Sequence, residues 1–350
     1  MRQILKNIFT LPAVALTLFV SGCGKEEAAV QGNFPADGVI RVSTEIGAMT
    51  RGSYTTDNLK EFDLVVGNNP SLGQTVDTKY CYKNTKFTLT NGVWTPAETM
   101  LWQNSTSLVT LLAVAPCLPE RESKSVSDFV NGVIWPMKVD QTADDTSADL
   151  LGWATPYNFT PKGLVDENGD LVLDESGKPQ GGLVDGKVKI RFTHLLSKLT
   201  VVFKLGTEFN HDGIPSRNIV SGVEVDNTWL EAIVCLSSYN EQPISAFGND
   251  EGECGSVRPY FTKWTPAGDK NSSCLSEYEC LLAPSATARP ESVEIKFRVN
   301  GIPYKFVTSV KFESGKAYTL TIKAGKDEVV TGTITAAAWD EQEGGTLETE

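Results

Sequence analysis

Short runs of β-branched and aromatic residues dominate this chain, and Gly, Asn, Asp and Pro separate one run from the next. Helical periodicity, in which apolar residues recur three and four positions apart, is nearly absent. Runs of this length and composition are typical of β-strands. The pattern predicts strands over residues 38–46, 61–66, 78–90, 107–115, 187–193, 198–205, 221–225, 292–299, 304–310, 317–322 and 329–334.

Two Asn-Gly pairs mark tight turns between such runs. Asn91-Gly92 separates residues 86–90 from 93–95, and Asn300-Gly301 plays the same part later in the chain. Asn-Gly suits a type I′ hairpin turn because both central residues need a positive φ. Many short strands joined by turn residues predict an all-β chain built from β-sandwiches.

The segment 161–186 is polar and rich in Gly and Asp. Asp166, Asn168 and Asp170 alternate in it as in a calcium-binding loop. However, a glycine precedes the third ligand position, and the twelfth position, which needs a bidentate Glu, is also a glycine. We therefore expect a solvated hairpin with an Asn-Gly turn at this place, and no metal site.

Gly181-Gly182 near the end of this segment predicts a domain boundary close to residue 183. The chain has 350 residues, which is too many for one small core and fits two domains of ordinary size. We expect an N-terminal β-sandwich over 52–183 and a C-terminal β-sandwich over 184–350, which ends in an acidic tail after Trp339.

The N-terminus has the pattern of an export signal. Arg2 and Lys6 precede an apolar run over residues 8–20, and small residues then lead to Cys23. A bilayer-spanning helix needs roughly 20 apolar residues, so this run is too short to span. The pattern predicts a signal peptide over 1–22 that is removed before Cys23.

The charge of the chain excludes several classes of partner. The formal net charge is −13, and it becomes −15 when residues 1–22 are removed with their two basic side chains. So acidic a surface repels phosphate backbones, which argues against nucleic-acid binding. It also argues against binding to anionic lipids through a basic face, and leaves membrane attachment to a lipid anchor.

Six cysteines follow Cys23, an even number in an oxidising compartment. This allows disulfides, first of all among the last four, whereas the first two lie in or beside strand-like runs and are expected as buried thiols as often as in pairs. No Cys-x-x-Cys pair occurs and the chain has two histidines, so no zinc site is expected. The six are Cys81, Cys117, Cys235, Cys254, Cys274 and Cys280.

The sequence gives no positive evidence of catalysis. It contains no Gly-x-Ser-x-Gly, Gly-x-Gly-x-x-Gly or Walker motif, and nothing selects a glycosidase pair among its many carboxylates. His194 could act as a base, but we expect a structural histidine bonded to a backbone carbonyl. The seven tryptophans are expected to be buried between sheets rather than to form a sugar-binding platform. We predict a non-enzymatic protein with no catalytic residue and no cofactor.

Val20-Ser21-Gly22-Cys23 resembles a bacterial lipobox, with Val20 where Leu is usual. The resemblance implies that Cys23 is acylated and becomes the first residue of the mature protein. Gly24-Lys25-Glu26-Glu27 follows and resembles the surface-export signal of Bacteroidales lipoproteins. Together they imply a lipoprotein on the outer face of the outer membrane.

A longer ordered set of segments comprises Met49-Thr50-Arg51-Gly52, Trp102 followed by 108–116, then 149–154, 188–203, 282–284, 315–320, and Ile334 with Trp339. Each motif alone is weak. In this order, after a lipobox, they resemble the fimbrillin family of Bacteroidales, the subunits of type V pili. The resemblance covers nearly the whole chain, from Cys23 to Trp339.

This resemblance implies two tandem transthyretin-like, Greek-key β-sandwiches. It implies that an Arg-specific protease cuts after Arg51, which removes the lipidated segment 23–51 with its first strand and leaves Gly52 as the new N-terminus. It further implies assembly with other pilus subunits by donor-strand exchange. The bland alternative for Arg51 is a solvated loop residue. The tail is short and acidic, and only 329–337 is apolar enough to be donated, so stalk, tip and accessory roles stay open.

The leading hypothesis is therefore a non-enzymatic pilus subunit or pilus-associated adhesion lipoprotein. The first alternative is a monomeric surface lipoprotein that binds a host glycan or host protein, motivated by the same anchor and by the tryptophans. The second is a secreted hydrolase whose active site cannot be recognised from the sequence.

Overall fold

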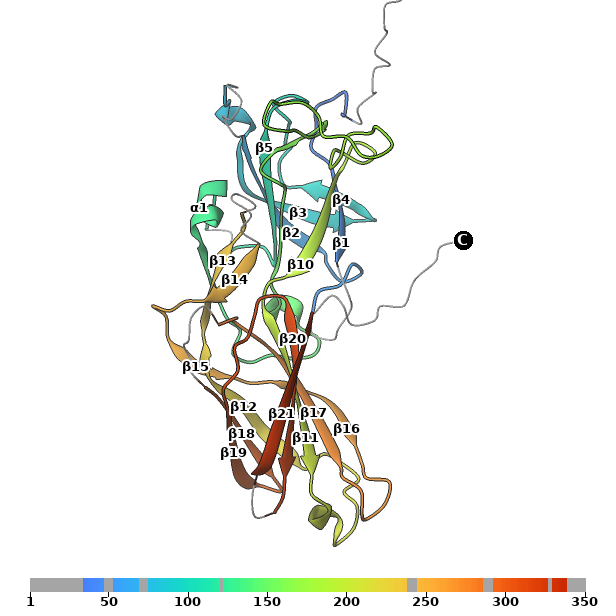
Figure 1. Cartoon of the computed structure of the whole chain (residues 1–350), viewed down its shortest axis with the longest axis vertical. Helices are drawn as coiled ribbons and strands as arrows, with labels where there is room; N and C mark the ends of the chain where they lie inside the picture. The colour runs from blue at the N-terminus through green and yellow to red at the C-terminus, as the bar shows by residue number, and fades with distance from the viewer. Residues whose placement is uncertain are drawn as a thin grey trace, which may run out of the picture. The chain divides into compact units, whose positions relative to one another are not determined.

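The computed structural model describes residues 34–46, 53–68, 75–119, 122–237, 244–285, 292–326 and 329–338 (Figure 1). The signal peptide, Cys23, Arg51, Gly52 and Trp339 lie outside these residues. The described part is nearly all β, which confirms the predicted fold class. It contains no helix that is long and apolar enough to cross a membrane.

A seven-stranded sheet has the strand order β1-β10-β7-β5-β2-β3-β4. β1 and β10 run parallel, and the other neighbouring strands run antiparallel. One face encloses a core in which the ring of Phe62 contacts Phe87, Trp94 and Phe192. The strands are β1 (Val42–Ile46), β2 (Glu61–Asn68), β3 (Tyr82–Thr90), β4 (Val93–Pro96), β5 (Val109–Ala115), β7 (Leu151–Ala154) and β10 (Val188–His194).

The two end strands of this sheet, β1 and β4, approach each other across the core. The indole Nε1 of Trp94 on β4 donates a hydrogen bond to the hydroxyl of Thr44 on β1, at 3.2 Å. The sheet therefore curls around its own core, and the first strand closes one side of it.

The C-terminal part of the chain forms a β-sandwich. A five-stranded sheet, β16-β17-β11-β20-β21, faces a four-stranded sheet, β15-β12-β18-β19, over a core that includes Phe203 from the first sheet and Phe297 from the second. The five-stranded sheet comprises β11 (Ser197–Leu205), β16 (Tyr260–Thr265), β17 (Leu275–Leu282), β20 (Lys316–Ala324) and β21 (Val329–Ala338). The other comprises β12 (Val220–Trp229), β15 (Cys254–Val257), β18 (Val293–Val299) and β19 (Ile302–Thr308).

A third core covers the other face of the seven-stranded sheet. It joins Val65 of β2 and Leu112 of β5 to the short helix α1 (Val126–Asn131) and to a three-stranded sheet of β6 (Val133–Pro136), β13 (Glu231–Cys235) and β14 (Ser245–Gly248). β2 and β5 are thus buried on both faces, which explains why their sequences are nearly continuous apolar runs. Ser125 and Asp128 form a capping box at the start of α1.

The chain changes sheet after β10. β10 still pairs with β1 and β7, although it lies beyond the predicted boundary at residue 183, and the five-stranded sheet begins three residues later with β11. The division into domains over 52–183 and 184–350 stays a prediction.

Both predicted Asn-Gly turns are present. Asn91 has φ 51° and Gly92 φ 77°, and Asn300 and Gly301 have φ 49° and 82°. These are the positive angles that a type I′ turn requires. They join β3 to β4 and β18 to β19 in tight register.

The polar segment forms turns stabilised by its own aspartate side chains. The Asp166 carboxylate accepts hydrogen bonds from the backbone N–H groups of Asn168 (2.8 Å) and Asp170 (3.0 Å). Eight residues later, Asp174 accepts from Ser176 and Lys178 in the same way. One oxygen of Asp166, the first residue of the calcium-like pattern, is thus engaged by its own turn. The strands β8 (Phe159–Thr160) and β9 (Gly163–Leu164) precede these turns.

Three short 3-10 helices complete the described elements, namely η2 (Thr78–Tyr80), η3 (Thr146–Ala148) and η4 (Thr207–Asn210). η2 corrects the prediction of a strand from residue 78, because the Asp77 side chain accepts a hydrogen bond from the N–H of Lys79 and starts a helical turn.

The cysteine prediction also needs correction. No disulfide joins the six cysteines, all of which lie in the described part of the chain. Cys274 and Cys280 are buried thiols in the C-terminal core, and the Cys274 sulfur accepts a hydrogen bond from the Ala267 N–H. Trp102, Trp135 and Trp229 are buried, as predicted for tryptophans between sheets, whereas Trp94, Trp153 and Trp264 are only half-buried.

Candidate functional site

The first strand and its neighbours form the candidate site. β1 (blue in Figure 1) lies beside β10 (green), and five residue pairs run in register from Val42–Val188 to Ile46–Phe192. Just before β1, the N–H of Ile40 donates to the carbonyl of Met100 at 2.9 Å. The first strand is therefore fixed by backbone pairing on both of these segments.

Alternate side chains of the first strand enter the N-terminal core. Ile40 is 1% exposed and Val42 is 7% exposed, and they belong to one cluster with Val188, Ile190 and Phe192 of the partner strand. Full burial of a side chain of this size contributes roughly 1.5–3 kcal/mol. Removal of the strand would expose this cluster and one backbone edge of β10.

The outward side chains of β1 carry charge. Glu45 forms an ion pair with Lys189 at 2.7 Å and a second with Arg191, both from β10. Hydrogen bonding to Lys189, assisted by Arg191, lowers the pKa of Glu45. These pairs lie at the surface, so their contribution to stability is small compared with that of the buried side chains.

A buried Asp-His pair stands at the end of β10. His194 Nδ1 lies 2.9 Å from Asp149 Oδ2, and both side chains are fully buried. Because a carboxylate only accepts, the histidine Nδ1 carries the proton. Asp149 also accepts hydrogen bonds from the backbone N–H of Leu150 (2.9 Å) and of Tyr54 (2.8 Å). The predicted carbonyl partner of His194 is thus wrong, since its partner is a carboxylate.

The N–H of Tyr54 belongs to a tight turn that follows the expected processing site. In this turn the N–H of Thr55 donates to the Asn58 side chain at 2.6 Å, and the Asn58 amide donates to the Ser53 carbonyl at 3.1 Å. The hydroxyl of Thr56 in turn accepts a hydrogen bond from the N–H of Ile46, the last residue of β1, at 3.2 Å. Residues on either side of the segment 47–52 are therefore held together.

The last strand, β21, contains the segment 329–337 that the sequence analysis named as a candidate donor strand. It pairs antiparallel with β20 over nine residue pairs, from Lys316–Ala338 to Ala324–Val329. Ile334 packs against the C-terminal core, whereas Thr333 and Thr335 are exposed. The segment predicted as a donor strand is thus paired within its own chain.

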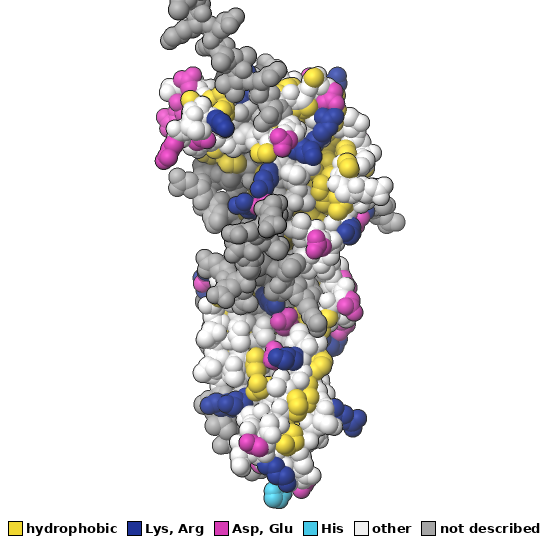
Figure 2. All heavy atoms as spheres, turned by 90° about the vertical axis from the view of Figure 1, so that its right-hand side faces the viewer, with side chains coloured by type: hydrophobic (Ala, Val, Ile, Leu, Met, Phe, Trp, Pro, Cys, Tyr) yellow, Lys and Arg dark blue, Asp and Glu magenta, His cyan; other side chains and the backbone are white. Residues whose placement is uncertain are grey.

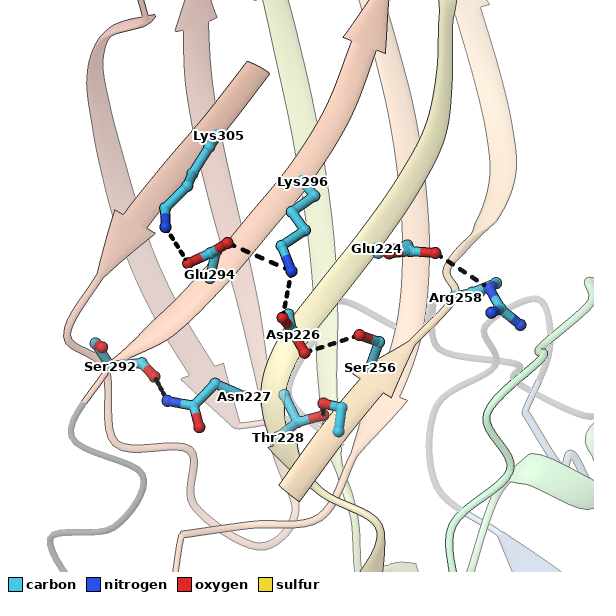
Figure 3. Close-up of polar contacts among 11 residues, drawn as sticks. Glu224, Asp226, Asn227, Thr228, Ser256, Arg258, Ser292, Glu294, Lys296 and Lys305 are labelled. Atoms are coloured by element: carbon cyan, nitrogen blue, oxygen red, sulfur yellow. Dashed lines mark hydrogen bonds and ion pairs between the residues drawn. The ribbon is translucent and has the colours of Figure 1, made fainter. Parts of the chain in front are cut away.

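The outer face of the four-stranded sheet carries a ladder of alternating charges (Figure 3). Lys296 lies between Asp226 (2.5 Å) and Glu294 (3.5 Å), and Glu294 also pairs with Lys305 (2.5 Å). These charges largely neutralise one another. No group of His, Cys, Asp or Glu in the described residues has the arrangement needed to hold a metal ion. The ladder is accordingly a solvated sheet face.

A shallow hollow of about 580 Å³ lies between α1 and β6. Its lining includes Glu122, Lys124, Asp128, Ile134 and Glu231, and the described residues contribute no aromatic ring to it. Ligand sites for small molecules are usually lined by apolar and aromatic side chains, so this hollow does not favour a glycan site. On the face shown in Figure 2, acidic and basic side chains are interspersed over the described residues.

Three site residues predicted from the sequence, Cys23, Arg51 and Gly52, lie outside the described residues. The structure brings together what flanks the last two, namely the end of β1 and the turn after residue 52. Sequence reasoning missed Asp149 as the partner of His194. Asp149 and His194 both lie in the segments that resemble the fimbrillin family, 149–154 and 188–203. That resemblance is the one feature of the sequence that could have linked the two residues.

Comparison with known proteins identifies the class. Residues 50–339 match the family model described as fimbrillin-like. The chain belongs to this family, which confirms the resemblance read from the sequence. No match is found among curated proteins.

Several solved structures are similar to this chain at low sequence identity. A candidate cell adhesion protein from Bacteroides ovatus superposes with a TM-score of 0.53 at 14% identity, over 85% of this chain and 95% of that one. A second candidate cell adhesion protein, from Bacteroides uniformis, has a TM-score of 0.48 at 18% identity, and the match covers 87% of this chain and 99% of that one. The tip fimbrial protein Mfa3 from Porphyromonas gingivalis has a TM-score of 0.44 at 12% identity, and the match covers 80% of this chain and 94% of that one.

Proposed function

We propose that this protein is a non-enzymatic subunit or accessory component of a type V pilus that serves adhesion. It is exported as a lipoprotein anchored at Cys23, cut after Arg51 by an Arg-specific protease, and joined to other pilus subunits by strand exchange. Membership of the fimbrillin-like family supports the pilus role. The observation that carries the assembly proposal is the first strand, which pairs with β10 and fills one side of an apolar core ahead of the proposed cut after Arg51.

The chemistry of strand removal supports this proposal. Loss of β1 would leave apolar side chains and the backbone groups of β10 exposed to water, and both are costly. A strand from another subunit that supplies the same pairing and the same apolar side chains satisfies both. Such a contact is head-to-tail, and head-to-tail contacts propagate into fibres.

The location follows from the same proposal. Acyl chains on Cys23 would hold the precursor at the outer membrane, on the cell surface. The lipidated segment 23–51 would then separate from two β-sandwich domains, 52–183 and 184–350. β21 is paired with β20 in the isolated chain, so its use as a donor would require it to leave that sheet.

One experiment tests these steps together. Surface protein from cells that express the wild type or Arg51→Ala is run on a non-boiled gel, and its N-termini are read by mass spectrometry. We expect the wild type to form a ladder whose units begin at Gly52, and the variant to remain a monomer that begins at acylated Cys23. Normal polymers from Arg51→Ala would show that this cut is not the assembly switch. Binding of uncut monomer to a glycan array would instead favour a surface binder.

A further inference from the structure

A closed set of contacts links the residues that lie before and after the segment 47–52 in the chain. β1 pairs with β10, whose last residue, His194, hydrogen-bonds to Asp149. The Asp149 carboxylate accepts a hydrogen bond from the N–H of Tyr54. Two residues later, the Thr56 hydroxyl accepts one from the N–H of Ile46 at the end of β1. Every contact in this set would survive a cut between residues 47 and 52.

The Asp149 carboxylate lies at the centre of this set of contacts. The Asp149 carboxylate is fully buried and accepts from three donors, Tyr54 N–H, Leu150 N–H and His194. Hydrogen bonds to a buried charged group are stronger than neutral ones, and their loss leaves a costly unsatisfied partner. Tyr54 is itself only 8% exposed, and burial raises the pKa of its hydroxyl to about 12. The turn after the cut site is therefore anchored to the body, and through Thr56 so is the end of β1.

We propose that Asp149, His194, Tyr54, Thr56 and Ile46 form an autoinhibitory clamp that keeps the first strand in place after cleavage. This inference rests on the proposed cut at Arg51. With the clamp, the cut subunit does not expose its apolar core at once. β1 stays bound non-covalently to the cut subunit until a competing strand displaces β1. The bound strand covers the apolar core and so prevents association with unrelated proteins.

The clamp is tested on the full-length chain in detergent. Hydrogen exchange is measured over residues 42–46 and 53–59 before cleavage. After treatment with an Arg-specific protease, the fraction of the fragment 23–51 that still elutes with the body is followed over time. The variants are Asp149→Asn, which replaces an acceptor oxygen by an amide, and Thr56→Val, which removes the hydroxyl at an exposed position. Thr56→Ser keeps the hydroxyl, and Asp174→Asn changes an aspartate of a distant turn.

We expect release of the fragment to be about tenfold or more faster in Asp149→Asn and several-fold faster in Thr56→Val, since one lost hydrogen bond of this kind corresponds to such factors. Exchange at 42–46 should rise in the same two variants before any cut, while Thr56→Val keeps the wild-type melting temperature. Thr56→Ser and Asp174→Asn should behave as wild type.

Wild-type release and exchange in Thr56→Val would overturn the clamp, even if Asp149→Asn fails to fold. If the protease leaves Arg51 intact in every variant, the proposed processing is wrong, and exchange in the uncut chain still decides whether the clamp exists.

Discussion

The first and last strands of the described chain are both end strands, yet they are held in different ways. β1 has five residues paired with β10, and its inward side chain Val42, together with Ile40 just before the strand, belongs to the N-terminal core. β21 has nine pairs with β20, but several of its side chains, such as Thr333 and Thr335, face solvent. β1 thus places a buried side chain in a core, whereas Ile334 of β21 is only partly buried against one.

This difference bears on exchange of strands. A strand held by side chains in a core leaves a shaped apolar groove when it departs, and the groove selects a replacement by its side chains. A strand held chiefly by backbone bonds leaves an edge that accepts many sequences. Under the proposed strand exchange, the N-terminal site would be the one that sets specificity between subunits.

The largest test of the comparison places a charge on each strand. Val42→Asp on β1 puts an unpaired carboxylate in the N-terminal core, which should destabilise the protein by about 3–5 kcal/mol. The matched change Thr333→Asp on β21 is exposed and should cost about 1 kcal/mol or less. Denaturant unfolding of both variants gives the two values. Equal losses would show that the two strands are held alike.

A second test concerns the close approach of Phe306 to Gly332 on β21. A Cβ added at Gly332 would lie 2.3 Å from the ring of Phe306 on β19, so the ring must shift. We expect Gly332→Ala to destabilise the chain by roughly 1–3 kcal/mol, as overpacking does. Gly268→Ala, which meets no atom within 4 Å, is the control. Thermal unfolding distinguishes them, and Phe306→Leu should restore part of the loss in Gly332→Ala. A neutral Gly332→Ala would mean that β21 adjusts freely at this point.

Much of the strand pattern could be predicted from the sequence because alternation records burial directly. Predicted 198–205 corresponds to β11 (Ser197–Leu205), and predicted 292–299 to β18 (Val293–Val299). The short strands β6, β13 and β14 were missed because each has only four or five residues, and they are stabilised by burial against the seven-stranded sheet. Local sequence does not contain that contact.

The candidate site was only partly predictable for a similar reason. The apolar residues around Val42 predict a buried strand. Nothing in the sequence shows that β1 pairs parallel with β10, which lies almost 150 residues later. Asp149 and His194 are 45 residues apart, and only the fold brings them to 2.9 Å. Long-range pairs of this kind depend on topology, which the residue pattern leaves open.

The smallest expected effect comes from the outward face of β1. Glu45 pairs with Lys189 and Arg191, and its side chain is about one-third exposed, so Glu45→Gln should cost only about 0.2–1 kcal/mol at pH 7. Because these cations lower the pKa of Glu45 in the folded state, the stabilisation is present above the ordinary Glu value near 4.5 and is lost as pH falls through the lower folded value. Unfolding midpoints of the two proteins should therefore differ at pH 7 and converge near pH 3, and high salt at pH 7 should narrow the gap as well. A difference that persists at pH 3 would show that Glu45 contributes through packing, and would remove the distinction drawn between the inward and outward faces of the first strand.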